Sequence, residues 1–349
     1  MKLITEELTI EESKHNTAIN AMCQENERKK YNARAYSRLG QSGAIFGLSL
    51  REQMTKYPIK VLSSDMSVTA GLDRFKSMYP EHFYNVGIAE QNLLGVSAGL
   101  ASEGFKSVAV AQAAFISMRS FEQVRQYMGY MHNNVIAIGI SSGFALTFFG
   151  NTHYAIEDLS LMRSIPNMIV LSPADAGEAI KAFEAALAVE SPVYIRLTGG
   201  LDNPVVYKED FEYEIGKSNI VYNAGEDITL FATGSMVYHS IKAAELLSEQ
   251  GISSRVIDMH TIKPLDYTII SSCRSSKLFV TVEEHNIVGG LGSAVADYIS
   301  AESIYPPLYK LGVADCFSRP GDYSYLLEQN RLTPELIAED VLLKYNTIV

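Results

Sequence analysis

Short apolar runs alternate with helical stripes along this chain, and this alternation limits the fold more than any other feature. Between the runs, apolar residues recur at helical spacing, as at Ile180, Phe183 and Leu187. Runs of this kind are expected for strands buried on both faces of a sheet. The alternation predicts an α/β fold with a mostly parallel sheet and helices on both sides. The runs are Val61–Ser64, Ser107–Ala111, Val135–Ile140, Met168–Leu171 and Val193–Leu197.

A second α/β unit is predicted after the polar stretch Leu201–Glu214. Its helix carries an apolar face around Val237 and Leu247, and Gly251 follows as a candidate C-terminal cap. We therefore expect a polar N-terminal arm at residues 1–30, an α/β domain at 31–205 and a second α/β domain at 212–349. The predicted strands of the second domain are Ile228–Thr233, Arg255–Asp258 and Leu278–Val282.

Composition and charge are those of a globular protein. The chain of 349 residues is 47% hydrophobic and carries a net charge of −11, which argues against nucleic-acid or anionic-membrane surfaces. No apolar run approaches the length needed to span a bilayer, and the N-terminus lacks the apolar core of a secretion signal. Cys23, Cys273 and Cys316 lie far apart, which indicates reduced thiols and no metal site. We expect a soluble, cytoplasmic protein.

Residues 84–92 place a carboxyl group at the start of a helix. Glu90 follows Gly87 and precedes a helix of small residues at Gln91–Leu100. Its neighbours are apolar, and burial favours the neutral form of a carboxyl group. Such a group can donate a proton near neutral pH, so Glu90 is a candidate catalytic residue. The structural alternative is a helix-capping glutamate.

Residues 87–91 resemble the Gly-Ile-x-Glu-(His/Gln) signature of transketolases and 1-deoxyxylulose-5-phosphate synthases. The resemblance implies thiamine diphosphate as cofactor, with Glu90 bonded to N1′ of its pyrimidine and thereby activating it. It extends to residues 114–123, where Phe115 takes the position of a phenylalanine that stacks on the pyrimidine, and Arg119 would fix the loop.

Residues 150–159 resemble the family block in which a histidine lies over the thiazolium ring and bonds to donor oxygens. His153 takes that position, and an imidazole gains and loses protons near neutral pH. His153 is therefore a candidate catalytic and substrate-binding residue. Asp65 and Met66 match a family turn near the cofactor. Met66 or Ile88 would support the bent cofactor, although either can equally be a core residue.

Two later segments, Val256–Asp266 and Thr281–Gly292, resemble the transketolase C-terminal domain. In the family this domain is mainly an assembly element, so we interpret His260 and His285 as structural or interfacial residues. The resemblance covers roughly residues 33–345.

The loop before His153 departs from the family pattern. Transketolases usually carry Gly-Glu-Asp there, and the aspartate binds a sugar hydroxyl. This chain has Thr147, Phe148 and Phe149 at these positions, and a phenylalanine cannot accept that hydrogen bond. The departure implies an atypical donor or acceptor, less hydroxylated or unphosphorylated, with Phe149 among the substrate-binding residues.

A second departure concerns the substrate phosphate. The strand Val193–Leu197 usually leads to a phosphate-binding arginine, whereas this chain has Gly199 and Gly200, with Arg196 nearby. Arg38 matches another phosphate-binding arginine of the family and is our candidate for that role. The alternative is that phosphate contacts come from a partner.

The Gly-Asp-Gly…Asn motif, which anchors the diphosphate through Mg²⁺ in this family, does not occur in the chain. The resemblance therefore implies the C-terminal subunit of a split transketolase. We expect the Mg²⁺ ligands on an N-terminal partner subunit, the cofactor between the two subunits, and an α2β2 assembly. We expect no metal ligand in this chain.

The predicted function is transfer of a two-carbon ketol unit from a ketose donor to an aldehyde acceptor, by a transferase that is active only with its partner. Three alternatives stay open. Among thiamine enzymes, the first alternative is a split 1-deoxyxylulose-5-phosphate synthase. The second is a 2-oxo acid dehydrogenase β subunit, which fits the motifs less well. A non-catalytic regulatory subunit of the same fold is the third.

Overall fold

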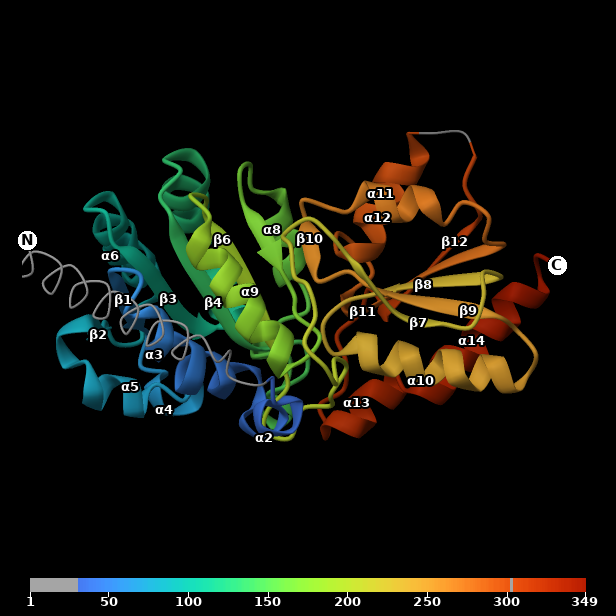
Figure 1. The fold of residues 1–349 in the computed structure, drawn as a ribbon, viewed down its shortest axis with the longest axis horizontal. Helices are drawn as coiled ribbons and strands as arrows, with labels where there is room; N and C mark the ends of the chain where they lie inside the picture. Colours follow the sequence, from blue (N-terminus) through green and yellow to red (C-terminus); the bar gives the residue numbers. More distant parts are fainter. Residues whose placement is uncertain (1–30, 302–303) are drawn as a thin grey trace, which may run out of the picture. The chain divides into compact units, whose positions relative to one another are not determined.

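The structure is a computed structural model that describes residues 31–301 and 304–349, so the predicted arm at 1–30 lies outside the described residues. Residues Ala33–Val349 form one compact unit that is built on two β-sheets with helices packed against them (Figure 1). The predicted fold class, two consecutive α/β domains with mostly parallel sheets, is confirmed. We call each sheet with the helices packed on it an α/β layer. Within the described residues no helix is long and apolar enough to cross a membrane.

The first sheet has seven strands in the order β10-β5-β6-β4-β3-β1-β2, and all neighbours are parallel except β10 and β5. Each apolar run predicted for the first domain forms one of these strands, with ends shifted by at most two residues. β2 was not predicted because it is short and only its first residue is buried. The strands are β1 (Ile59–Ser63), β2 (Phe83–Asn85), β3 (Lys106–Gln112), β4 (Val135–Ser142), β5 (Ile169–Leu171), β6 (Val193–Thr198) and β10 (Thr261–Lys263).

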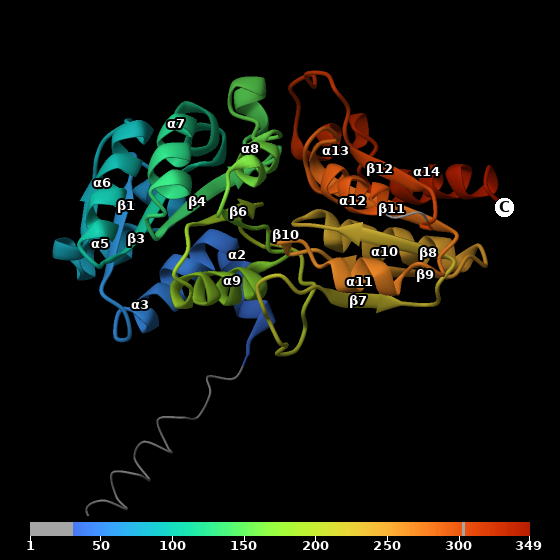
Figure 2. The same cartoon turned by 90° about the horizontal axis from the view of Figure 1, so that it is seen from above.

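Helices pack on both faces of the first sheet. Figure 2 shows α2, α3 and α9 on one side of the strands and α6, α7 and α8 on the other. π-Helical turns at Ile45–Ser49, Phe115–Arg119 and Val124–Tyr130 interrupt this helical layer. The helices are α2 (Ala33–Ala44), α3 (Leu50–Gln53), α4 (Ser67–Ala70), α5 (Asp73–Met78), α6 (Glu90–Ser102), α7 (Phe121–Gln123), α8 (Asp158–Ser164) and α9 (Ala176–Ala188).

The second sheet has five strands in the order β12-β11-β8-β9-β7, with β7 antiparallel to β9. Figure 1 shows α10, α13 and α14 on one side of this sheet and α11 and α12 on the other. Its strands are β7 (Asn219–Asn223), β8 (Ile228–Ala232), β9 (Ser254–Asp258), β11 (Leu278–Asn286) and β12 (Leu308–Val313). Its helices are α10 (Met236–Glu249), α11 (Tyr267–Ser272), α12 (Leu291–Ser300), α13 (Tyr323–Gln329) and α14 (Pro334–Asn346).

One strand from the second predicted domain completes the first sheet. In β10, Thr261 pairs with Leu171 and Lys263 with Val170 of β5. Beside it, the Ser172 N–H donates to the carbonyl oxygen of His260 at 2.8 Å. The same apolar cluster contains core residues of both layers. The predicted domain bounds stay a prediction, but the two layers share one sheet and one core at this junction.

Two buried carboxyl groups meet at the junction, one on α9 and one at the end of β9. Glu178 Oε2 accepts the Ala174 N–H at 2.6 Å, and Asp258 Oδ2 accepts the Tyr207 hydroxyl at 2.7 Å. Their other oxygens, Glu178 Oε1 and Asp258 Oδ1, have no donor among the described residues. Burial raises the pKa of Asp258 to about 7. Burial, and then the neighbouring Asp258, raises the pKa of Glu178. A proton held between the two groups supplies the missing donor.

We expect this pair to make the free energy of unfolding fall as pH rises. In the unfolded chain both groups titrate near pH 4, so between about pH 4 and pH 7 the folded chain binds more protons than the unfolded one. The pair therefore stabilises the folded chain below about pH 4. Roughly 2–4 kcal/mol of this stabilisation is lost as the pH rises from about 4 to about 7. Urea denaturation of wild type and Asp258→Asn at pH 5 and pH 8 measures this loss. Between pH 5 and pH 8, the free energy of unfolding should fall less in the variant than in wild type. Asp315→Asn, at an exposed site, should follow wild type, and an equal pH dependence of all three proteins would refute the shared proton.

Candidate active site

Glu90 is buried at the N-terminus of α6, where only 2% of the residue is exposed. Its Oε2 accepts a hydrogen bond from Arg119 Nη1 at 2.8 Å, which forms an ion pair. The sequence predicts apolar surroundings for this carboxyl group, and the guanidinium corrects that prediction. The π-helical turn Phe115–Arg119 is what brings Arg119 back to α6. Among the described residues, Glu90 Oε1 makes no hydrogen bond.

Aromatic rings continue from this ion pair toward His153. The guanidinium carbon of Arg119 lies 4.1 Å from the centre of the Phe115 ring, a cation–π contact. Phe115 meets the His153 ring edge-on, with centroids 5.2 Å apart. Phe149 stacks on His153 at 4.6 Å, with an angle of 23° between the ring planes. The structure thus brings together five of the predicted residues, Glu90, Arg119, Phe115, His153 and Phe149, which we call the site cluster.

The imidazole of His153 is held at one nitrogen. Its Nδ1 lies 2.8 Å from the hydroxyl oxygen of Thr152. Its Nε2 has no hydrogen-bond partner among the residues that the structure describes. The stacked ring of Phe149 and the edge contact with Phe115 fix the ring plane, so Nε2 is the atom that can meet a substrate oxygen.

Among the described residues, the other predicted site residues do not take part in the contacts of the site cluster. Asp65 has a positive φ of 59° and accepts a hydrogen bond from Asn85 Nδ2 at 3.0 Å, which ties the turn after β1 to the segment that leads to Glu90. Met66 packs against the core of the first sheet, whereas Ile88 is exposed. Arg38 is exposed on α2. In the described part of the chain, no hydrogen bond, ion pair or ring contact joins Met66, Ile88 or Arg38 to the site cluster.

His153 and Phe149 belong to a closed loop, Gly143–Ala155, which we call the His153 loop. Gly143 and Ala155 exchange two backbone hydrogen bonds at its base, at 2.9 and 3.1 Å. Gly143 has a φ of 61°, and a Cβ built there would lie 2.2 Å from Glu284 Oε1. The base of the loop therefore requires glycine, because any side chain would collide with that carboxylate.

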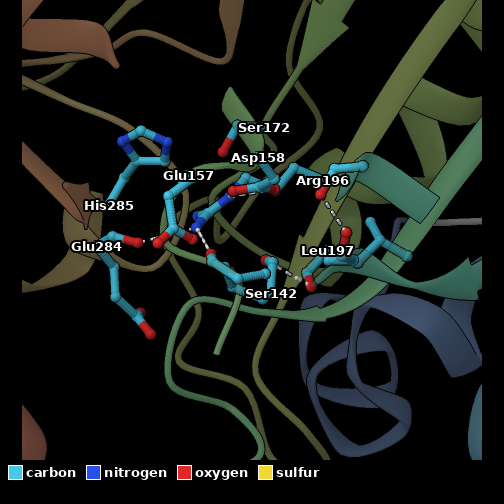
Figure 3. Close-up of polar contacts among 12 residues, drawn as sticks. Ser142, Glu157, Asp158, Ser172, Arg196, Leu197, Glu284 and His285 are labelled. Carbon is cyan, nitrogen blue, oxygen red and sulfur yellow. Dashed lines mark hydrogen bonds and ion pairs between the residues drawn. The ribbon is translucent and has the colours of Figure 1, made fainter. Parts of the chain in front are cut away.

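A buried arginine connects the His153 loop to the second sheet (Figure 3). Arg196, only 1% exposed, donates from Nε to Asp158 Oδ2 at 2.9 Å. Its Nη2 donates to the carbonyl oxygens of Ala155 at 3.1 Å and Glu284 at 2.8 Å. Arg196 is thus a structural residue of the interior and is committed to these contacts. The turn after it is formed by Gly199, with a φ of 78°.

The side chain of Glu284 on β11 binds the first residues of the His153 loop. Its Oε1 accepts the Phe144 N–H at 2.6 Å, while its Oε2 accepts hydroxyls of Tyr323 at 2.7 Å and of Ser235. The next residue, His285, lies beside this network in Figure 3, and burial lowers the pKa of His285 to about 4. The motif around His285 was noticed in the sequence, but the role of Glu284 was not. The sequence did contain an indication of it, because two adjacent glutamates directly follow the apolar run Leu278–Val282.

Comparisons with known proteins agree with this architecture. The family model of the transketolase pyrimidine-binding domain matches residues 42–201, and that of the transketolase C-terminal domain matches residues 216–337. A putative transketolase C-terminal section from Methanocaldococcus jannaschii is 37% identical over 300 residues, which are 85% of this chain and 94% of the relative. The chain belongs to the transketolase family. This relative is described as the C-terminal section of a transketolase, and nearly its whole length is matched.

Two further transketolase relatives are similar along most of the chain. The 6-deoxy-6-sulfo-D-fructose transketolase subunit of a Clostridium species is 38% identical over 80% of this chain and 86% of its own length. A solved structure described as a split gene transketolase, inactive beta4 tetramer, is 38% identical with a TM-score of 0.79, and covers 88% of this chain and 98% of the other. The predicted resemblance to the C-terminal subunit of a split transketolase is confirmed.

We expect the ion pair at the base of the His153 loop to be worth far more than an exposed one. Asp158→Asn leaves the buried charge of Arg196 without its counterion, which typically costs about 3–5 kcal/mol of unfolding free energy. Asp297→Asn breaks the Arg163–Asp297 pair, in which the aspartate side chain is 72% exposed, and should cost less than about 1 kcal/mol. Guanidinium denaturation of both variants measures the difference. Equal losses would contradict the structural role assigned to Arg196.

Proposed function

We propose that this chain is the pyrimidine-side subunit of a split, thiamine-diphosphate-dependent transketolase, which transfers a two-carbon ketol unit from a ketose to an aldehyde. The observation that carries the proposal is the site cluster. A buried carboxyl group at a helix N-terminus, an aromatic ring and an imidazole with one free nitrogen lie in one continuous series of contacts. This is the set of groups that the family uses on the pyrimidine and the substrate.

The residues present fit the cofactor. Glu90 Oε1 is left for a hydrogen bond to the pyrimidine, and Phe115 offers a ring on which it can stack. There is also open space beside Gly87, three residues before Glu90, since a Cβ built there would meet nothing within 4 Å. When bound, thiamine diphosphate supplies the carbon nucleophile that breaks the carbon–carbon bond of the ketose. Asp65, Met66 and Ile88 stay proposed cofactor contacts.

The chain's own residues have distinct roles in this proposal. Glu90 Oε1 exchanges a proton with the pyrimidine, while Oε2 stays paired with Arg119, which keeps the carboxyl group oriented. His153 Nε2 hydrogen-bonds to the reacting oxygen of the sugar and moves a proton to or from it. Arg38 stays a proposed ligand for a substrate phosphate. None of these groups binds the diphosphate.

A partner subunit is therefore part of the proposal. In the described part of the chain, no group of acidic, histidine or cysteine side chains is placed to hold a metal ion, and the sequence contains no Gly-Asp-Gly. We infer that an N-terminal transketolase subunit carries the Mg²⁺ and diphosphate ligands and forms an α2β2 assembly with this chain. The similarity to an inactive beta4 tetramer supports self-association of this subunit and inactivity without the partner.

Calorimetric titration of thiamine diphosphate with Mg²⁺ tests this arrangement. We expect binding to an equimolar mixture of this chain and its N-terminal partner, and none to this chain alone. Binding to the isolated chain would refute the proposed location of the diphosphate. No binding in either sample would favour the non-catalytic subunit. Release of CO2 from pyruvate with glyceraldehyde 3-phosphate as acceptor would favour a split 1-deoxyxylulose-5-phosphate synthase.

Glu90→Gln should leave the assembly intact but lower turnover by orders of magnitude, because the amide cannot exchange a proton with the pyrimidine. Gel filtration measures assembly, and steady-state ketol transfer measures turnover. Glu122→Gln is the matched control, because Glu122 is an exposed glutamate on α7 that makes no hydrogen bond or ion pair with the site cluster among the described residues. Turnover of Glu90→Gln close to wild type would refute the role of Glu90.

A further inference from the structure

The tip of the His153 loop presents two phenylalanine rings beside the candidate catalytic imidazole. Phe148 is 80% exposed and Phe149 is 51% exposed. The two rings contact one another with centroids 4.8 Å apart, and Phe149 stacks on His153. Aromatic rings next to a catalytic group are thus the surface that a bound molecule would meet.

The fold does not use these two rings for its own stability. Phe144, in the same loop, is fully buried and meets Tyr154 edge-on at 5.1 Å, so the loop already has an aromatic anchor. The loop is closed by backbone hydrogen bonds at Gly143 and Ala155. Two adjacent exposed rings beside a candidate catalytic imidazole are therefore available to a bound molecule.

Two polar side chains that follow the rings in the loop are held by other contacts. Asn151 Nδ2 donates to the carbonyl oxygen of Ser318 at 2.8 Å, in the second α/β layer, and the Thr152 hydroxyl bonds to His153. Pro320 lies against Gly150 and supports the loop from the same side. The ligand therefore meets ring faces next to His153 Nε2.

We propose that Phe148 and Phe149 form a selecting wall that favours acceptor aldehydes lacking hydroxyl groups on the carbons next to the carbonyl. The inference rests on the proposed transferase function and deepens it by naming a substrate class. With the carbonyl oxygen at His153 Nε2, the adjoining carbons lie against Phe149, because that ring is stacked on the imidazole. A hydroxyl there loses its hydrogen bonds to water and gains none from a ring face.

An apolar wall of this kind discriminates against an added hydroxyl by about tenfold to a hundredfold. Propanal and glyceraldehyde form a matched pair of acceptors, because they have the same carbon chain and differ only in hydroxyl groups. We expect kcat/KM for propanal to exceed that for glyceraldehyde by at least about tenfold in the wild-type enzyme.

The experiment uses the complete complex with its partner subunit, thiamine diphosphate and Mg²⁺, with hydroxypyruvate as the two-carbon donor. Phe149→Asp and Phe148→Asp place a hydrogen-bond acceptor on the wall, and each should lower the propanal-to-glyceraldehyde ratio of kcat/KM by about tenfold or more. Phe149→Leu keeps the wall apolar and should keep the wild-type preference. Tyr130→Asp, at an aromatic residue that is 83% exposed on a different turn, should not change the ratio.

Each outcome decides between explanations. A ratio of kcat/KM that is the same in wild type and both aspartate variants, in an intact complex, overturns the selecting wall and leaves the proposed function standing. Dissociation of the complex in the aspartate variants, with the ratio unchanged in the remaining activity, means that the rings belong to the subunit interface. Absence of two-carbon transfer to either aldehyde, with either donor hydroxypyruvate or D-fructose 6-phosphate, overturns the proposed function and the inference with it.

Discussion

One buried guanidinium holds the candidate site in place. The charge of Arg196 is balanced by Asp158 at the start of α8, and Nη2 donates to the carbonyl oxygens of Ala155 and Glu284. Burying a charge without such partners is costly, so the end of the His153 loop, the start of α8 and strand β11 must be in place together. This explains why the second α/β layer, which contributes no residue to the site cluster, is nevertheless needed to build it.

The sequence predicted the parts of the molecule that depend on local pattern. Continuous apolar runs give the strands of the first sheet, and Glu90 could be found because a carboxyl group before a small-residue helix is a local signal. Contacts between distant segments were missed. The pairing of β10 with β5 and the ion pair of Arg119 with Glu90 join residues that are far apart in the chain, and no periodicity reports them. The sequence also does not report which side chains are exposed. Phe144 and Phe148 are the same residue type in one loop, yet Phe144 is buried and Phe148 is exposed.

Carboxyl groups at the junction of the two layers are satisfied in three different ways. Asp158 is paired with the guanidinium of Arg196. Glu284 is surrounded by one N–H and two hydroxyl donors, which together solvate a carboxylate in the interior. Glu178 and Asp258 have fewer donors than oxygens and therefore need a proton between them. The number of donors around each group thus differs, and the pair with too few donors is the one whose contacts we expect to depend on a proton.

In the His153 loop, the contacts that fix the loop lie at its base, and the side chains that would meet a substrate lie at its tip. All the contacts that fix its base involve backbone atoms of the loop: the N–H of Phe144, the carbonyl oxygen of Ala155 and the paired groups of Gly143. Side chains at the tip can therefore change without loss of the contacts that fix the base of the loop. Only Phe149 combines the two roles, because its ring both orients the imidazole and faces the bound molecule. A substitution there changes what the site accepts and also how firmly its histidine is held, whereas Phe148 changes only the former.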